Sequence, residues 1–396
     1  MKKNLKNRKI NVGRRSTLKR LGAIAAYSLG FPYINFGSHK LFASTNKRYS
    51  NRSISLVTEN IVIDMLGLIT LNVDTQKRWG SAGDGISQKD INEFKSSGIN
   101  VFHHAYGVGG KNQTEAKINC LNFIGSLNSL IANRPDVFMR IDSIRDMTNV
   151  MDNGKVGVML GIQNASHFIT EDDVDLFHDL GQRVSQLTYN SRNMIGNGST
   201  ERIDGGISDF GSRIIERMNK VGMAIDVSHC GDQTTLDAFD ISKKPVLITH
   251  SNVRALNPSH PRCKTDEAIK KMAKNGSVIG ITNVRNFVKA TEPTTIEHLL
   301  DQFDYVRDLV GSEHLGIGSD IDLHGYDDTP AKWYKELKAG YKGSYAFREK
   351  IDIEGVDHPK RMFDLTDGLI RRGYSDREIR GILGNNFKRV LSKIWT

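Results

Sequence analysis

The sequence of 396 residues has only three cysteines, Cys120, Cys230 and Cys263, at uneven spacing. They imply no disulfide framework, and we expect them to be small buried side chains. Beyond the first 43 residues, no segment approaches the ~18 consecutive apolar residues of a membrane-spanning helix. No Gly-x-Gly-x-x-Gly motif follows the first predicted strand, which argues against a dinucleotide-binding fold.

The net charge of +10 does not come from the body of the chain. Ten of the 55 lysines and arginines lie within residues 1–43, which contain no acidic residue, and the remaining 45 equal the 45 aspartates and glutamates. A neutral body gives no electrostatic argument for binding nucleic acid.

The basic leader has the layout of a twin-arginine export signal. Arg14-Arg15-Ser16-Thr17-Leu18-Lys19 precedes an apolar stretch, residues 21–31, that is too short to span a bilayer. We therefore expect residues 1–43 to direct export to the periplasm, residues 44–58 to be a polar linker, and residues 59–396 to be the folded domain. A basic disordered arm is the alternative interpretation.

Short apolar runs rich in β-branched residues recur along the folded domain. They are Ile61–Leu66, Ile99–His104, Val156–Gln163, Val184–Tyr189, Ala224–His229, Val246–His250, Val278–Thr282 and Leu315–Asp320. Continuous rather than alternating apolarity is typical of parallel strands that are covered on both faces by helices.

Helix-like stretches lie between these runs, and each opens with a residue that can cap a helix. They include Ser87–Ser97, Asp209–Val221, Asp232–Ile241 and Thr265–Asn275. Eight strand–helix units favour a single closed (β/α)8 barrel over an open doubly wound sheet. We also expect a long irregular loop at residues 326–359 and two amphipathic helices at residues 358–395.

The carboxyl ends of the strands form the active face of such a barrel. The residues at the predicted strand ends are His103, His104, Gln163, Tyr189, His229, His250 and Asp320. A single histidine on a strand is usually a core residue, but several that converge on one pocket indicate function. Imidazoles with a carboxylate suit a zinc-type ion or a metal-free acid–base site.

Long segments of the chain resemble the membrane (renal) dipeptidase family of zinc hydrolases. They are FGSRIIERMNKVGMAIDVSHCGDQTTLDAF, KKPVLITHS, HPRCKTDEAIKKMAKNGSVIGI, LVGSEHLGIGSDID and RGYSDREIRGILGNNFKRVL. The resemblance runs from about residue 61 to the carboxyl terminus, and it implies a (β/α)8 barrel, the fold that the strand pattern also predicts.

Five residues match functional positions of that family. By this resemblance, His229 and His250 bind one zinc ion of the family's pair, and Asp320 acts at the other ion and as a proton shuttle. Arg262 matches the arginine that grips the substrate carboxylate, and Asp266 follows it at the family's spacing.

Other positions depart from the family. Its first strand ends in His-x-Asp, two ligands of the first metal, where this chain has Leu66 and Leu68. The glutamate that bridges both metals is Gln163 here, and the histidine of the family's Thr-His-Asn segment is Tyr189. Leucines cannot bind a metal, and a neutral amide cannot offset two divalent cations. Ordinary two-zinc dipeptidase activity is therefore not expected.

The remaining groups suggest a different reaction. Arg262 can neutralise a carboxylate, which makes the adjacent proton easier to remove, and Tyr189 with a strand-end histidine could serve as acid and base. His103 and His104 add further imidazoles. We therefore predict an exported lyase or dehydratase that eliminates water or an alcohol from a carboxylate-bearing substrate, such as a uronate-terminated oligosaccharide.

Two alternatives remain open: a divergent one-metal hydrolase of dipeptides, amides or lactones, and an inactive binding protein. One divalent ion, zinc first, is expected at His229, His250 and Asp320, although a metal-free site is also consistent with the sequence. Gln163 and His324 are further candidates for substrate binding. The family's habit of forming dimers makes a homodimer the expected assembly.

Overall fold

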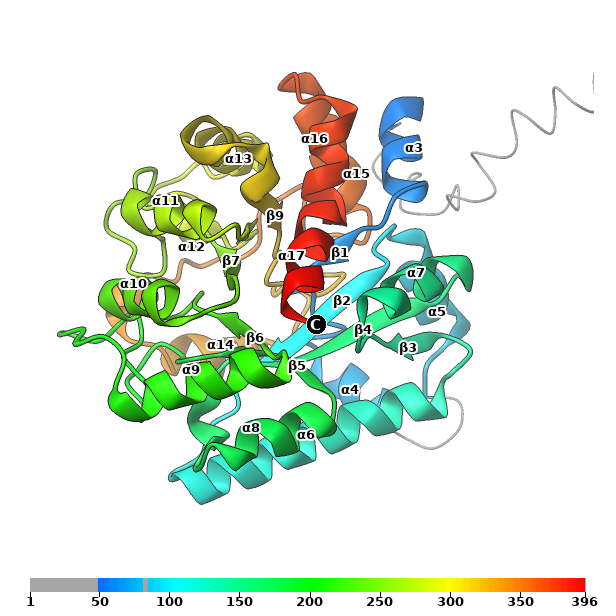
Figure 1. Cartoon of the computed structure of the whole chain (residues 1–396). Coiled ribbons are helices and arrows are strands. Elements are labelled where there is room, and N and C mark those ends of the chain that lie inside the picture. Colours follow the sequence, from blue (N-terminus) through cyan, green and yellow to red (C-terminus); the bar gives the residue numbers. More distant parts are fainter. Residues whose placement is uncertain (1–48, 81–84, 396) are drawn as a thin grey trace, which may run out of the picture. The chain divides into compact units, whose positions relative to one another are not determined.

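Eight parallel strands close into a barrel, which confirms the predicted (β/α)8 fold (Figure 1). The computed structural model describes residues 49–80 and 85–395, so the predicted export signal lies outside the described residues. The strands are β1 Ile63–Asp64, β2 Val101–Tyr106, β4 Val156–Ile162, β5 Gln182–Gln186, β6 Ala224–Asp226, β7 Val246–Ser251, β8 Ile279–Ile281 and β9 Leu315–Ile317. They pair in that order, and β9 pairs with β1 to close the ring.

Each of the eight predicted apolar runs overlaps one of these strands. The sequence does not predict β3 (Phe138–Arg140), which pairs with β4 outside the ring order. Only Phe138 of this three-residue strand is buried, so its apolar signal is weak.

The four predicted helices are also present: α5 Gln88–Ser96, α9 Asp209–Val221, α10 Asp232–Ile241 and α11 Asp266–Lys274. The side chains of Ser87, Ser208 and Thr265 accept a hydrogen bond from the backbone N–H three residues on, which fixes where α5, α9 and α11 begin. Gly222, at φ 83°, ends α9.

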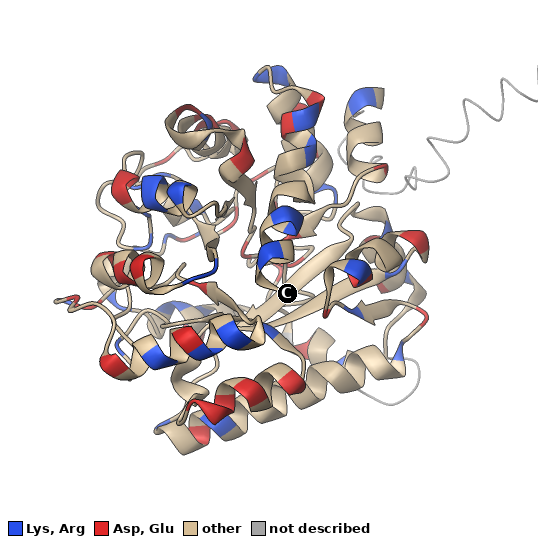
Figure 2. Ribbon diagram, viewed as in Figure 1, with Lys and Arg blue, Asp and Glu red and all other residues tan. Residues whose placement is uncertain are grey.

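The other helices around the barrel are α4 Val73–Gly80, α6 Gln113–Asn133, α7 Ile144–Asp152, α8 Asp172–Asp179, α12 Arg285–Val288 and α13 Ile296–Val310. Within the described ranges, no helix combines the length and the apolar character needed to cross a membrane. Lysines and arginines alternate with acidic residues on the outer helices in the view of Figure 2, as expected for a neutral body.

Two segments that the sequence predicts as irregular contain helices. Residues 51–58, assigned to the linker, form α3 (Asn51–Thr58), which begins at the capping side chain of Ser50 and buries Leu56 and Val57. The long loop at residues 326–359 contains α14 (Ala331–Ala339) and a 3-10 turn, η3 (Gly343–Tyr345).

The carboxyl-terminal helices close one end of the barrel. After α15 (Arg361–Arg371), the chain runs through α16 (Asp376–Arg380), a π-helical turn (η4, Gly381–Asn385) and α17 (Asn386–Ile394). The buried face of α17 packs on side chains from the amino ends of the strands, and Figure 1 shows α17 at the centre of the ring of helices. A Cβ on Gly316 would lie 2.2 Å from the Phe387 ring, so glycine is required there. Only the opposite, carboxyl end of the barrel is left for a site.

Candidate active site

His229 and His250 form the centre of the site. His229 lies in the turn after β6 and His250 near the end of β7, and their Nε2 atoms face each other across 3.0 Å. Both side chains are buried, at 1% and 0% exposure. Two nitrogens bound at about 2.0–2.1 Å to one tetrahedral zinc ion would lie about 3.3 Å apart, close to this separation.

The partners of the other ring nitrogens fix both imidazoles. His229 Nδ1 donates to Asn190 Oδ1 (2.7 Å), and His250 Nδ1 donates to Thr249 Oγ1 (2.8 Å). The Thr249 hydroxyl donates in turn to Asp226 Oδ2 (2.7 Å), so it can only accept from His250. Both Nε2 lone pairs therefore point into the same space, an arrangement that suits a shared cation.

Burial lowers the pKa of both imidazoles well below the ordinary histidine value, and the positive charge of Arg262 lowers it further. The two rings are therefore neutral at physiological pH, which is the form that binds a metal.

Asp320 follows β9 with a left-handed backbone, φ 61°, which is uncommon for a residue with a side chain. Burial raises the pKa of its carboxyl to about 7, although the charge of Arg262 opposes the rise. Its backbone N–H donates to the carbonyl of Leu66 (2.9 Å), which ties Asp320 to the β1 side of the barrel. A carboxyl that titrates near neutrality can act as acid or base.

Tyr189 lies directly on His229, with ring centroids 4.1 Å apart and an interplanar angle of 20°. Its hydroxyl lies 2.6 Å from that of Tyr341, which follows α14. Burial raises the pKa of Tyr189 well above the ordinary value, and the neighbouring Tyr341 and Tyr345 raise it further. Tyr189 is therefore a neutral phenol that can donate a proton or a hydrogen bond.

Arg262 is fully buried beside the histidine pair. Its guanidinium donates to the carbonyls of Ser228 and His250 and lies 5.2 Å from the centre of the Phe287 ring. Its Nε has no hydrogen-bond partner among the described residues. Asp266, the next matched position, accepts a hydrogen bond from the Tyr305 hydroxyl (2.8 Å) at the start of α11.

The opposite side of the barrel mouth is apolar. Leu66 and Leu68 are buried in a cluster with Leu71 and Ala105, and Tyr106, Tyr326 and Trp333 pack against it. The amide nitrogen of Gln163 donates to the carbonyl of Ala105 (2.7 Å). Hydrocarbon and a neutral amide therefore line this side of the mouth.

The residues present fit one ion at most. Within residues 49–80 and 85–395, no three His, Cys, Asp or Glu side chains come together in a way that would hold a metal. The structure thus pairs His229 with His250, and among the described residues Asp320 does not complete a three-ligand set with them.

Among the described residues, none of the three other predicted histidines forms a hydrogen bond with this pair, although the charge of His103 acts on His250 through space. His103 points into the barrel, where its Nε2 lies 2.0 Å from the position of a Cβ on Gly161 and has no partner among the described residues. His104 points outward, accepts from the Ile69 N–H (3.0 Å) and packs on Phe123. Burial lowers the pKa of His104 to about 3.

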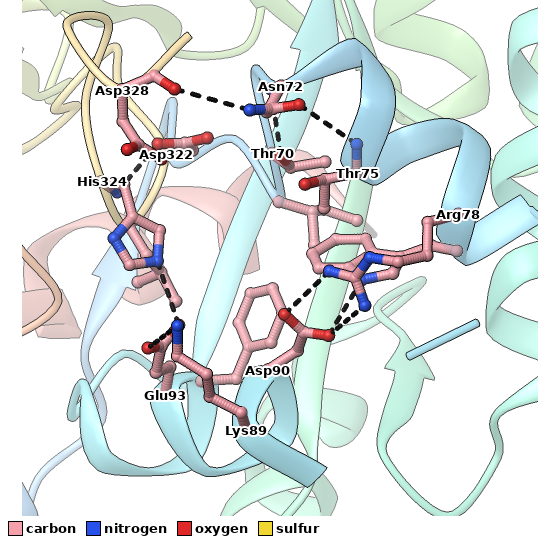
Figure 3. A pocket seen from close by; sticks show the side chains of 14 residues that line it. Thr70, Asn72, Thr75, Arg78, Lys89, Asp90, Glu93, Asp322, His324 and Asp328 are labelled. Carbon is pink, nitrogen blue, oxygen red and sulfur yellow. Dashed lines mark hydrogen bonds and ion pairs between the residues drawn. The ribbon is translucent and has the colours of Figure 1, made fainter. Parts of the chain in front are cut away.

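His324 lies in a different, polar pocket of about 280 Å³ (Figure 3). Its Nε2 is 3.0 Å from Glu93 of α5, and Arg78 is paired with Asp90 on the other side of the pocket. The residues that fix the histidine pair, namely Asn190, Asp226, Thr249 and Lys264, are not found by the strand-end rule. Asp226, which ends β6 three residues before His229, carries the only sequence signal among these four residues.

Comparisons with known proteins identify a family that this chain matches. Residues 51–338 match the sequence profile of the family described as Membrane dipeptidase (Peptidase family M19). Dipeptidase verJ of Clonostachys rogersoniana is 28% identical over 275 residues, which cover 68% of this chain and 64% of that relative. Dipeptidase ataJ of Aspergillus terreus is 26% identical over 342 residues, which cover 78% and 77%. The chain therefore spans less than two thirds of the first relative.

Solved structures share the fold. An amidohydrolase from Pseudomonas aeruginosa has 30% identity and a TM-score of 0.74, with 87% of this chain and 99% of that chain covered. A metallo peptidase from Rhodobacter sphaeroides, liganded with a phosphinate mimic of the dipeptide L-Ala-D-Ala, has 18% identity and a TM-score of 0.69, with 85% and 100% covered.

Proposed function

The chain belongs to the membrane dipeptidase family (peptidase family M19), and from that premise we propose that it hydrolyses a small amide or dipeptide-like substrate with one divalent metal ion, zinc, in place of two. The observation that carries the proposal is the facing pair of Nε2 atoms on His229 and His250, opposite the buried Leu66 and Leu68. The dipeptide mimic bound by the Rhodobacter relative supports the substrate class.

His229 and His250 would hold the ion, which when bound polarises a carbonyl oxygen and offsets developing negative charge. Asp320, with a pKa of about 7, takes a proton from water and returns it to the leaving amine. Arg262 holds the substrate carboxylate, since a planar guanidinium pairs with both carboxylate oxygens. Gln163 lines the mouth of the barrel as a neutral hydrogen-bonding group.

Elimination is the second candidate function, and the position of Tyr189 favours it. Its neutral phenol stacks on His229 and could protonate a leaving hydroxyl, while Arg262 neutralises a uronate carboxylate. A bound metal is not required for this reaction. In both candidate reactions the substrate is a small carboxylate-bearing molecule, and nucleic acid is not a partner.

Mass spectrometry of products distinguishes the two reactions. We expect cleavage with gain of water from a panel of dipeptides, and about one zinc per chain by metal analysis. Loss of water from a uronate-terminated oligosaccharide, with a new ultraviolet-absorbing double bond, would establish elimination instead. Tyr189→Phe should abolish elimination but only slow hydrolysis. No conversion in either panel would favour a binding protein.

We also propose export through the twin-arginine pathway, on the strength of Arg14-Arg15 and the short apolar stretch that follows. The full chain should appear in the periplasmic fraction, and replacement of both arginines by lysine should retain it in the cytoplasm. Equal distribution of the two proteins would contradict export by this route.

A further inference from the structure

Lys264 is a buried cation for which the proposed reaction has no use. It lies two residues beyond Arg262, and its side chain is 2% exposed. Its ammonium donates to the carbonyls of Val227 (2.7 Å) and Cys230 (2.9 Å) and to Thr235 Oγ1 (2.9 Å). An ammonium has three donors, so all of them are used.

Among residues 49–80 and 85–395, no carboxylate forms an ion pair with this ammonium. Asp232, the acidic group that acts on Lys264 through space, is itself paired with Arg254. Burial of an unpaired ammonium costs desolvation free energy that an apolar side chain would avoid. The hydrogen bonds made by Lys264 are therefore the physical reason for a lysine at this position.

These hydrogen bonds surround His229. The two carbonyls that Lys264 holds belong to residues 227 and 230, on either side of the histidine, and Thr235 lies on α10 behind the turn. Arg262 holds the carbonyl of Ser228, in the same turn, and that of His250 on the neighbouring strand. One short segment thus fixes the backbone of both histidines.

We propose that Lys264 is a positioning residue that holds His229 at the separation from His250 needed for one metal ion. This inference rests on the proposed one-metal function. Lys264 makes no hydrogen bond to either histidine side chain among the described residues; it acts on the pair through the backbone of the β6 turn, and its positive charge also acts on both rings through space. Groups of this kind typically change metal affinity by 10–100-fold when they are removed.

The test is Zn²⁺ affinity, measured by competition with a chromophoric chelator, for Lys264→Met and for a matched control, Lys360→Met. Lys360 is also buried and donates to a backbone carbonyl, that of Ser96, away from the site. We expect Lys264→Met to raise the zinc Kd by about 10–100-fold and Lys360→Met to change it less than about twofold. An unchanged Kd in Lys264→Met, or an equal rise in both variants, would overturn the proposal.

A milder variant covers the case in which Lys264→Met does not fold. Thr235→Val removes one of the three hydrogen bonds at nearly constant volume and leaves the ammonium bonded to both carbonyls. A zinc Kd raised several-fold would support the positioning role, and an unchanged Kd would count against it.

A second readout separates this inference from the proposed function. If the wild-type protein binds no zinc, the one-metal proposal fails, and long-range ¹H–¹⁵N spectra of the imidazoles then decide the role of Lys264. We expect the His229 Nδ1–H signal, which reports the hydrogen bond to Asn190, to be lost in Lys264→Met and kept in Lys360→Met. Retention in both variants would overturn the proposal.

Discussion

The two sides of the barrel mouth have opposite characters. On the β6–β7 side, His229 and His250 are held by Asn190 and Thr249, and the Thr249 hydroxyl donates in turn to Asp226. On the β1–β2 side, Leu66 and Leu68 pack against aromatic rings, and the imidazole of His103 lies in the barrel interior without a hydrogen-bond partner for its Nε2 among the described residues.

The difference indicates that the two sides of the mouth are held in place by separate sets of contacts. The histidine pair is fixed by its own hydrogen bonds and by the cations of Arg262 and Lys264, none of which comes from β1 or β2. A change on one side therefore need not disturb the geometry of the other. Each half should respond separately to mutation.

Removal of a histidine should have the largest effect. His250→Ala removes one of the two facing Nε2 atoms, so bound zinc should fall from about one ion per chain to none. His324→Ala, in the separate pocket of Figure 3, should retain the ion. Metal analysis of dialysed protein measures both, and zinc retained at full occupancy in His250→Ala would refute the assignment of the pair.

Asp320→Asn should reduce kcat by about 10²–10⁴-fold, the usual contribution of a general base. The carboxylate form is the base, so wild-type activity should rise with pH and reach half its maximum near pH 7, the raised pKa of Asp320. The variant should lose this rising limb. A pH profile that keeps the limb in Asp320→Asn would assign the titration to another group.

A polar side chain placed in the apolar β1–β2 side of the mouth should lower the stability of the fold. Leu66→Asn places an unsatisfied amide in the cluster of Leu68 and Trp333 and should lower the free energy of unfolding by about 2–4 kcal/mol. Leu256→Asn, at a leucine that is 37% exposed, should change it by less than about 0.5 kcal/mol. Urea unfolding measures both, and equal stability of the two variants would show that the cluster does not depend on its apolar packing.

The fold was largely predictable because its signals are local. Eight apolar runs and the capping residues Ser87 and Thr265 place strands and helices without knowledge of their neighbours. α3 was not predictable, because its stability depends on contacts distant in sequence. Tyr49, just before it, donates to Asp364, and Arg52 pairs with Asp376. Such contacts leave no periodic pattern in a short polar segment.

The site was predictable only in part. The strand-end rule finds His229, His250 and Asp320, but it cannot decide which of the adjacent His103 and His104 faces the barrel interior. That choice depends on the register of β2, and Gly161 on the neighbouring strand makes room for His103 alone. The contacts of Lys264 were not visible in the sequence because they are hydrogen bonds to two backbone carbonyls and one hydroxyl of distant residues.

His324 illustrates the same limit, because its position depends on a turn. The Asp322 carboxylate accepts hydrogen bonds from the N–H groups of His324 and Gly325 and turns the chain toward α5. A sequence distance of four residues from Asp320 therefore does not bring His324 to the histidine pair.

The smallest expected effect tests whether the His324 pocket and the histidine pair are separate sites. Glu93 raises the pKa of His324 through a hydrogen bond and its charge, so their ion pair stabilises the fold while His324 is protonated. That contribution is complete below the unfolded pKa of about 6.5 and is lost as pH rises through the higher folded value. Because the His324 side chain is 41% exposed, we expect only about 0.5 kcal/mol.

Glu93→Gln should therefore lower the free energy of unfolding slightly at pH 6 and not at pH 9, and added salt should reduce the difference. The zinc Kd should not change, since Glu93 and His324 share no contact with His229 or His250 in the described chain. A zinc Kd that rises in Glu93→Gln would mean that the pocket and the histidine pair are coupled through the β9 turn. The two sides of the barrel mouth would then no longer be independent.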